Sequence, residues 1–481
     1  MAYKHGVYVS EVPTSIVPAV NTTAGLPVVF GTAPVHLATD RAAANRPVLC
    51  YSYAEAVQQL GFSKDWTKYT LCEVMYSQFA LYNRGPVVFV NVLDPKTHKK
   101  SVADKSVDIA DRVATLDAPV LLDTLKIKAS AVGSELVAGK DYEAAYDDDG
   151  ALVITLLDDG TASAASSLIL TYDELDPTAV DQDDIIGGIS VSDGSVKGLE
   201  CLNKVFPLTG LVPGIVLAPG WSHEPTVAAV MKAKAGNINS HFKAITLNDV
   251  PTESVKKYTD VKNWMNQNSY NDTAQVVCWP MVKMGDDIYH MSTHVLGVIA
   301  TVDSANGDIP YESPSNKSMQ INGCCLKDGT EVVLGPDEAG YLNGQGVVTA
   351  LNFIGGWKCW GNRTACYPSN TDPKDAFISI RRMFYWQAQT FIQTYWAKVD
   401  KPINKRLIQT VMDSENIRLN GLTAQGCILG GRVEFRDDEN PVTNLMDGII
   451  KFHTYITPCA PAREIENVLE YDPAYFETLF S

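Results

Sequence analysis

Dense apolar segments near the beginning of the chain predict strands that are buried on both faces. Residues 24–33 (AGLPVVFGTA) and 85–93 (GPVVFVNVL) contain no charged side chain, which is typical of a parallel sheet covered by helices. Between them, residues 52–60 and 70–83 predict helices, because the apolar positions of the second segment recur near helical spacing. Strands and helices therefore alternate, as they do in α/β folds.

The same alternation resumes after a long interval. Residues 214–218 form another apolar segment, residues 224–235 predict a helix, and residues 242–247 predict the next strand. We therefore expect one discontinuous α/β domain, formed by residues 24–93 and 200–345.

The intervening segment, residues 94–199, differs from its flanks in charge and in pattern. Residues 101–200 hold 21 acidic and 6 basic side chains, so nearly all of the net charge of −17 arises there. Short apolar and β-branched runs alternate with Asp-Gly turns, which predicts a small antiparallel sandwich or barrel. The acidic turns are expected to face water, so we assign residues 94–199 to an inserted, outward-facing all-β domain. The predicted strands are residues 119–129, 141–146, 151–157 and 167–172.

The last part of the chain, residues 346–481, predicts helices followed by strands. Residues 374–399 carry one apolar face, and a second helix is expected at Pro402, because proline is tolerated in the first turn of a helix. Three later segments are strand-like, and residues 6–12 alternate at the other end. Such ends, including an N-terminal arm over residues 1–23, pair with the chain's own sheets or add a strand to a neighbour's sheet. The later strand-like segments are residues 432–435, 448–457 and 467–471.

These segments define the expected fold class. It is a discontinuous α/β (α+β) core with an inserted all-β domain and with strand-like arms at the N- and C-terminal ends.

Composition narrows the class of protein further. The negative net charge argues against a general nucleic-acid-binding face, and no run of eighteen apolar residues predicts a membrane span. The first residues lack the apolar core of a secretory signal, and the ten cysteines are scattered apart from Cys324-Cys325. We therefore expect a cytoplasmic chain with reduced, mostly buried cysteines, without membrane insertion and without nucleic-acid contact.

Two spacings resemble chemical motifs but lack an essential residue. His290 and His294 are four residues apart, but Met291 stands where a zinc protease needs glutamate, and the turn residues just before them argue against a helix. Gly344 and Gly346 lack the last glycine of a dinucleotide-binding loop. We expect packing or surface histidines and a loop glycine pair.

Other candidates are equally incomplete. The acidic triplet at residues 437–439 precedes Asn440-Pro441, which favours a solvated turn over a metal site. A sugar-binding role for the insertion is the competing hypothesis, but residues 101–200 contain only three aromatic side chains, all tyrosines, and no tryptophan for stacking on sugar rings. The sequence therefore predicts a non-enzymatic protein with no catalytic residue, no metal and no cofactor. The three tyrosines are Tyr142, Tyr146 and Tyr172.

Fragments along almost the whole chain outside residues 101–200 carry a family resemblance. They are GVYVSE (6–11), AGLPVVFGTA (24–33), PVLCYSYAEAVQQLGF (47–62), residues 69–92, GIVLAPGW (214–221), WPMVK (279–283), residues 310–322, YLNGQGVVTALNFIGGWKCWG (341–361) and residues 367–382. In this order they resemble the contractile phage tail sheath family, which includes sheaths of myovirus-type tails and of phage-tail-like bacteriocins. One departure lies in LNFIGG (351–356), which carries no basic residue where the family has an arginine, so the contact of that arginine is absent or shifted here.

The resemblance implies a structural function in a polymer. Sheath subunits form stacked six-fold rings around an inner tail tube, and the sheath contracts to drive the tube through a target cell envelope. The implied partners are other copies of the chain, the inner tail tube protein, and baseplate and tail terminator proteins. The implied location is a virion tail or tail-like particle assembled in the bacterial host cytoplasm. The alternative is a static tubular shell subunit that does not contract.

The resemblance also implies roles for particular residues. The N-terminal arm and a C-terminal strand are donated to neighbouring subunits, and basic residues near Pro402 contact the inner tube; a solvated helix face is the simpler alternative for these basic residues. The implied N-terminal strand residues are Val7, Tyr8, Val9 and Val12; the C-terminal ones are Val468, Leu469 and Tyr471, with residues 448–457 as the other candidate strand; the tube-contact residues are Lys401, Lys405 and Arg406.

Overall fold

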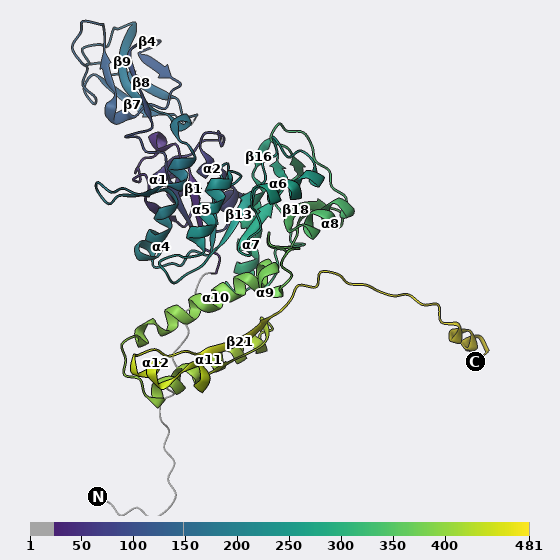
Figure 1. Ribbon diagram of the computed structural model, residues 1–481. Helices are drawn as coiled ribbons and strands as arrows, with labels where there is room; N and C mark the ends of the chain where they lie inside the picture. The colour runs from purple at the N-terminus through teal and green to yellow at the C-terminus, as the bar shows by residue number, and fades with distance from the viewer. Residues whose placement is uncertain (1–23, 148, 481) are drawn as a thin grey trace, which may run out of the picture.

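The computed structural model describes residues 24–147 and 149–480. Three parts follow one another along an elongated molecule: a small β unit, a central α/β unit, and a unit of long helices with a β-hairpin (Figure 1). The C-terminal segment leaves the last unit and extends away from the body (Figure 1).

The central unit is built on a mixed sheet of eight strands. Its six middle strands are parallel, and the two outer strands are antiparallel to their neighbours. Every residue of its strands β1 and β3 is buried, which explains why their sequences are apolar without alternation. In their order across the sheet the strands are β2 (Pro47–Cys50), β3 (Val87–Asn91), β1 (Pro27–Gly31), β12 (Ile215–Leu217), β13 (Ile245–Asp249), β14 (Gln275–Cys278), β18 (Val347–Asn352) and β19 (Trp357–Trp360).

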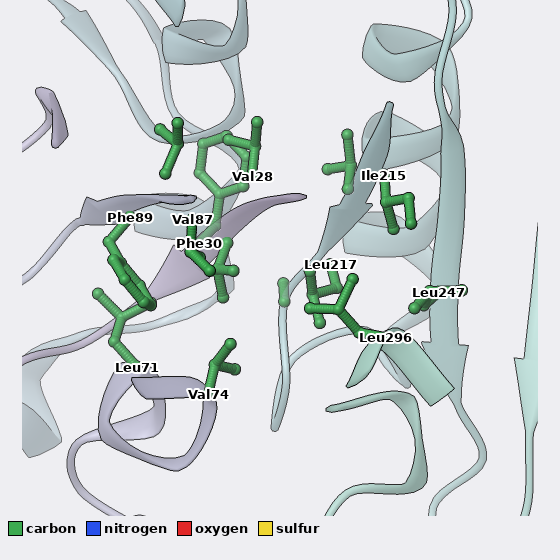
Figure 2. Close-up of a cluster of buried hydrophobic side chains, with 14 of the residues drawn as sticks. Val28, Phe30, Leu71, Val74, Val87, Phe89, Ile215, Leu217, Leu247 and Leu296 are labelled. Atoms are coloured by element: carbon green, nitrogen blue, oxygen red, sulfur yellow. The ribbon is translucent and has the colours of Figure 1, made fainter. Parts of the chain in front are cut away.

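Helices connect the parallel strands and cover the sheet. Leu71 and Val74 lie beneath Phe89, and Leu296 lies on the same side beneath Leu217, so α2 and α7 cover one face (Figure 2). The helices of this unit are α1 (Tyr53–Leu60), α2 (Thr70–Met75) with its π-helical continuation η2 (Tyr76–Leu81), α4 (Leu202–Thr209), α5 (Pro225–Ala235), α6 (Val261–Gln267), α7 (Met291–Ala305) and α8 (Pro336–Gly344). A small antiparallel sheet beside them contains β16 (Asp287–Tyr289), β15 (Met281–Met284) and β17 (Gly323–Cys325).

The inserted unit consists of two antiparallel three-stranded sheets with a hydrophobic core of their own. Three of its strands coincide with the predicted ones, whereas β4 and β5 were not predicted. The predicted strand over residues 119–129 is shorter, because only Lys126–Lys128 is a strand and Leu122–Thr124 is a 3-10 helix. Most residues of β4 are exposed, so no hydrophobic pattern indicated it. The sheets are β4 (Lys99–Asp108), β9 (Ser167–Leu175) and β6 (Lys126–Lys128), and β5 (Val113–Leu116), β8 (Leu152–Leu156) and β7 (Tyr142–Tyr146).

The chain returns to the central unit before residue 199. The small sheets end at Leu175, and Val180, Ile185 and Leu199 are part of the main hydrophobic core. The acidic composition continues through this stretch because Asp181 and Asp184 form a capping box at the start of a helix. The elements here are α3 (Gln182–Ile186), β10 (Gly188–Ile189) and β11 (Val196–Lys197).

The C-terminal unit packs two long helices against a β-hairpin. The helix predicted over residues 374–399 is broken at Phe377, whose backbone is extended. The next helix begins at Lys405 and not at Pro402, because the side chain of Asn404 caps it and accepts the Leu407 N–H at 2.9 Å. The elements are α9 (Pro373–Ala376), α10 (Ile378–Tyr395), α11 (Lys405–Ala424), β20 (Ile428–Glu434), α12 (Val442–Met446), β21 (His453–Pro458) and the 3-10 helix η9 (Pro473–Phe480).

None of the helices in the described part of the chain is both long enough and apolar enough to cross a membrane.

Candidate assembly surface

The hairpin of β20 and β21 is a two-stranded sheet within the described residues. Such a sheet has two outer edges, and each edge presents backbone N–H and C=O groups to a further strand. The two edges differ. Asn416 of α11 accepts the Val433 N–H at 2.8 Å and donates to the Val433 carbonyl at 3.1 Å, so a side chain already occupies the outer edge of β20 at this position.

The opposite edge of the hairpin lies along β21. Val433 is paired with Thr454, and the backbone groups of Val433 point toward Asn416 and away from β21. In an antiparallel pair, residues opposite each other either exchange both hydrogen bonds or exchange none. The backbone groups of Thr454 therefore point outward, which leaves the β21 edge the more accessible one.

The C-terminal segment presents apolar side chains to solvent. Residues 459–472 belong to no helix or strand of the described chain, and the segment extends from the body (Figure 1). Val468 is 80% exposed, Leu469 87% and Tyr471 75%. The candidate strand over residues 448–457 is different, because only His453–Pro458 is a strand and it pairs within the chain. A run of exposed apolar residues this close together indicates an interaction site.

The predicted N-terminal strand, Val7, Tyr8, Val9 and Val12, lies outside the described residues. The first described residue, Ala24, packs in the hydrophobic cluster of the C-terminal unit together with Met383 and Trp386. The N-terminal segment therefore joins the described chain beside α10.

The three basic residues predicted to contact a tube lie together at one end of the C-terminal unit. Lys401, Lys405 and Arg406 are exposed around the turn between α10 and α11, and none of them has an ion-pair partner among the described residues. The apolar side chains of this turn were not predicted as part of a contact surface, although Trp396 and Val399 are also exposed. Both residues lie inside the predicted helix over residues 374–399, so the pattern did not indicate that they would be exposed.

The connection between β20 and β21 lies at this same end. Phe452, just before β21, contacts Phe391 near the end of α10, with ring centroids 6.3 Å apart. The short helix α12 within this connection exposes Val442 and Met446. We name the surface formed by residues 396–406 and 442–446 the tip of the C-terminal unit.

A buried ion pair joins the C-terminal unit to the central unit. The guanidinium of Arg382 on α10 binds both carboxylate oxygens of Asp303 on α7, with Nη1 to Oδ1 at 3.0 Å. Both side chains are almost completely buried. Gln389 adds a hydrogen bond of 2.9 Å to the Lys243 carbonyl, so α10 is fixed to the central unit at two places.

A crevice at the carboxyl ends of the parallel strands is where α/β folds commonly bind ligands. It measures about 510 Å³ and lies near the start of α7. Asp249 accepts hydrogen bonds from the Ser292 N–H and hydroxyl, and Glu73 accepts the His290 N–H. These carboxylates therefore occupy the helix terminus, which is the part of such a crevice that commonly binds an anion.

The two histidines identified in the sequence have structural contacts here. His290 precedes α7, so the segment is helical after the turn, contrary to the expectation, because Asp249 and Glu73 cap its first residues. His294 is fully buried, and burial lowers its pKa to about 3; its Nδ1 lies 3.0 Å from the Tyr82 hydroxyl. Among residues 24–147 and 149–480, no group of three or more His, Cys, Asp or Glu side chains is arranged to hold a metal ion.

Raising the pH from about 6.5 to above 9 is expected to remove the stabilisation that the Glu73–His290 pair provides. Burial lowers the pKa of His290, but the charge and hydrogen bond of Glu73 outweigh burial and raise that pKa to about 9. A histidine whose pKa is raised on folding stabilises the fold fully below its unfolded pKa, and this contribution is lost as the pH rises through the folded pKa. The measurement is the urea midpoint of wild type and of Glu73→Gln at several pH values.

The difference in midpoint between wild type and Glu73→Gln is expected to be larger at pH 6.5 than at pH 9.5. Glu331→Gln is the matched control, because Glu331 is exposed and forms no ion pair or side-chain hydrogen bond with His290 or Glu73. If the urea midpoints of wild type and Glu73→Gln differ by the same amount at pH 6.5 and at pH 9.5, the assignment of a charged pair is contradicted.

The fold and the sequence both match known proteins along the chain. The tail sheath protein of Burkholderia phage BcepMu is 27% identical over 99% of this chain and 98% of its own length. The tail sheath protein of Escherichia phage P2 is 23% identical over 73% of this chain and 84% of its own length. No family model matches the chain.

Solved structures share the fold at lower identity. The sheath of an extracellular contractile injection system, PVC, in its contracted state has a TM-score of 0.57 and 14% identity, covering 98% of this chain and 99% of that chain. The helical sheath of the anti-feeding prophage in its contracted state has a TM-score of 0.56 and 14% identity, covering 97% of this chain and 98% of that chain. These comparisons confirm the predicted resemblance: the chain is similar in sequence to phage tail sheath proteins and similar in fold to the sheaths of contractile injection systems.

Proposed function

We propose that the chain polymerises helically around an inner tube and contracts to drive that tube through a target cell envelope. The observation that carries the proposal is the exposed apolar C-terminal segment next to a two-stranded hairpin whose β21 edge is accessible. Each copy contains both the C-terminal segment and the hairpin edge, but within one copy the segment does not pair with that edge. A contact between different surfaces of successive copies generates a helical polymer when its rotation does not close a ring.

Strand donation is the proposed contact between copies. Val468, Leu469 and Tyr471 of one copy add a strand to the β21 edge of another, because Asn416 obstructs the β20 edge. Main-chain hydrogen bonds supply the affinity of such pairing, and alternate side chains supply the register. The N-terminal residues Val7, Tyr8, Val9 and Val12 are proposed as a second donated strand.

This type of contact suits a contracting polymer. Donated strands stay attached by main-chain hydrogen bonds while the bodies of the subunits rotate about the flexible connections. The C-terminal segment has the required length, since residues 459–472 span up to about 45 Å when extended. The extended sheath is then a trapped state that a trigger at the baseplate releases.

The proposed partners are other copies, the inner tail tube protein, and the baseplate and terminator proteins at the ends of the sheath. The proposed location is a tail or tail-like particle assembled in the cytoplasm of a bacterial host. We propose no enzymatic activity, because the buried carboxylates of the crevice bind the start of α7.

Reversing two charges at the tip is expected to weaken co-assembly with the tube protein. Lys405→Glu combined with Arg406→Glu turns attraction for an acidic tube surface into repulsion. Single exposed ion pairs contribute only about 0–1 kcal/mol, but a change of about 1.4 kcal/mol per subunit lowers binding about tenfold. We expect a decrease of about that size in the amount of protein that sediments with preformed tubes.

The matched control reverses two adjacent lysines elsewhere, Lys256→Glu with Lys257→Glu, on the exposed surface of the central unit. It is expected to sediment with tubes as wild type does, and added salt is expected to weaken wild-type binding. Equal sedimentation of the tip variant and the control would exclude the tip as the tube contact.

A further inference from the structure

A second cavity, of about 370 Å³, lies where the C-terminal segment leaves the body. Residues 461–463 at the beginning of the segment form one wall. Helix α8, residues 313–316, and the end of β19 with the chain that follows it form the others. The polar and aromatic side chains that line it are those of Ser313, Ser315, Asn316, Asn343, Trp360, Asn362, Arg363, Tyr367 and Arg463.

The charge of this cavity is uniformly positive. Arg363 and Arg463 are its charged lining residues, and no aspartate or glutamate is among the described residues that form its wall. Arg463 has one partner, the neighbouring Glu464, at 3.0 Å on the exposed side. The other lining residues are hydroxyl, amide, aromatic and small apolar ones, so the wall offers donors to an anion without a competing carboxylate.

Arg363 is fixed in place but has no acceptor. Its guanidinium lies 3.7 Å from the centroid of the Phe377 ring and 4.4 Å from that of Tyr367. Among the described residues it has no ion pair and no side-chain hydrogen bond, and its Nε is buried without a partner. Burial and the charge of Arg463 lower its pKa. A guanidinium packed between aromatic rings is preorganised to bind a carboxylate through two parallel hydrogen bonds.

We propose that this cavity binds a carboxylate group, supplied in the polymer by an aspartate or glutamate of a second copy of the chain. Charge complementarity supports this occupant, because the chain carries a net charge of −17. The exposed C-terminal segment is itself acidic, with Glu464, Glu466 and Glu470 against the single base Arg463. Only the source of the carboxylate rests on the proposed function; the site itself does not.

Occupation of the cavity would fix the start of the C-terminal segment. Because Arg463 forms part of the wall, a carboxylate between it and Arg363 holds the segment in one direction as it leaves the body. Ordering a segment before it pairs removes part of the entropy cost of binding. The site would therefore favour donation of the strand at residues 467–471.

The first experiment measures binding to the full-length chain before polymerisation, with succinate as the probe. We expect a saturable change in calorimetry at constant ionic strength. Arg363→Gln and Arg463→Gln are each expected to weaken binding at least tenfold, and Arg363→Lys to restore part of it. Lys374→Gln, which removes an exposed charge outside the cavity, is the control and is expected to bind as wild type does. Absent binding, or equal binding by wild type and Arg463→Gln, would overturn the site.

The second experiment identifies the source by trypsin cleavage after Arg463, measured as release of residues 464–481. We expect slow cleavage in wild-type polymer and fast cleavage in polymer of Arg363→Gln. Equal protection in both polymers would overturn a second copy as the source. If wild-type chain forms no polymer, the proposed function fails, whereas the succinate result still decides the site.

Discussion

Replacing Asp303 by alanine is expected to lower the free energy of unfolding by about 3–5 kcal/mol. Arg382 would then be a buried guanidinium without its carboxylate, since its exposed fraction is 3% and Asp303 binds it through two oxygens. The expected loss is large because the remaining charge stays desolvated and unpaired. Chemical unfolding followed by tryptophan fluorescence measures it.

The matched control is Asp328→Ala, which breaks the exposed pair between Asp328 and Lys256. That change is expected to cost no more than about 1 kcal/mol. Replacing both buried partners, Asp303→Leu with Arg382→Met, is expected to recover much of the stability, because no unpaired charge remains. A loss for Asp303→Ala as small as that of the control would contradict the assignment of a buried pair.

The Asp303→Ala variant is also expected to disturb assembly. The Asp303–Arg382 pair joins α7 of the central unit to α10 of the C-terminal unit, and Ala24, where the N-terminal segment joins the described chain, packs beside α10. Loosening this junction changes how the hairpin and the tip are presented to neighbouring copies.

Deleting residues 464–481 is expected to abolish tube formation and to leave thermal unfolding unchanged. The deleted segment buries little against its own chain, since Ile465 is 88% exposed and Val468, Leu469 and Tyr471 are also exposed. Its loss therefore removes the proposed donor strand without removing core contacts. The measurements are sedimentation for the polymer and calorimetry for the melting temperature.

A substitution pair separates strand donation from a general effect of exposed apolar residues. Val468→Ser with Leu469→Ser is expected to reduce tube formation strongly. Val132→Ser with Val191→Ser also removes two fully exposed apolar side chains but lies away from the segment, so it is expected to leave assembly unchanged. Tubes of normal length from the deletion variant would exclude the C-terminal segment as a donor.

Much of the fold could be predicted where hydrophobic pattern and burial agree. The apolar residues 24–33 and 85–93 contain β1 and β3, since strands buried on both faces need apolar residues throughout. Strand β4 could not be predicted, because its exposed side chains leave no pattern. The helix after His290 was also missed, because its start is capped by side chains distant in sequence.

The assembly surface was predictable only in part. Exposed strand-like and basic segments are visible in the sequence, and the structure leaves Val468 and Lys405 exposed. Interactions between distant residues left no signal. Asp303 and Arg382 are 79 positions apart, and the occupation of the β20 edge by Asn416 depends on the packing of α11 against the hairpin. Such pairs become visible only when the folded chain brings them together.

We propose that copies of this chain form a sheath that exists in an extended form and in a shorter, contracted form. The most direct test is electron microscopy of the purified protein with and without its inner-tube protein. We predict short, wide tubes or stacked rings from the protein alone, and a longer, narrower form only when the tube protein is present. A single form in both samples would contradict contraction and favour a static shell, and a persistent monomer in both would contradict self-assembly.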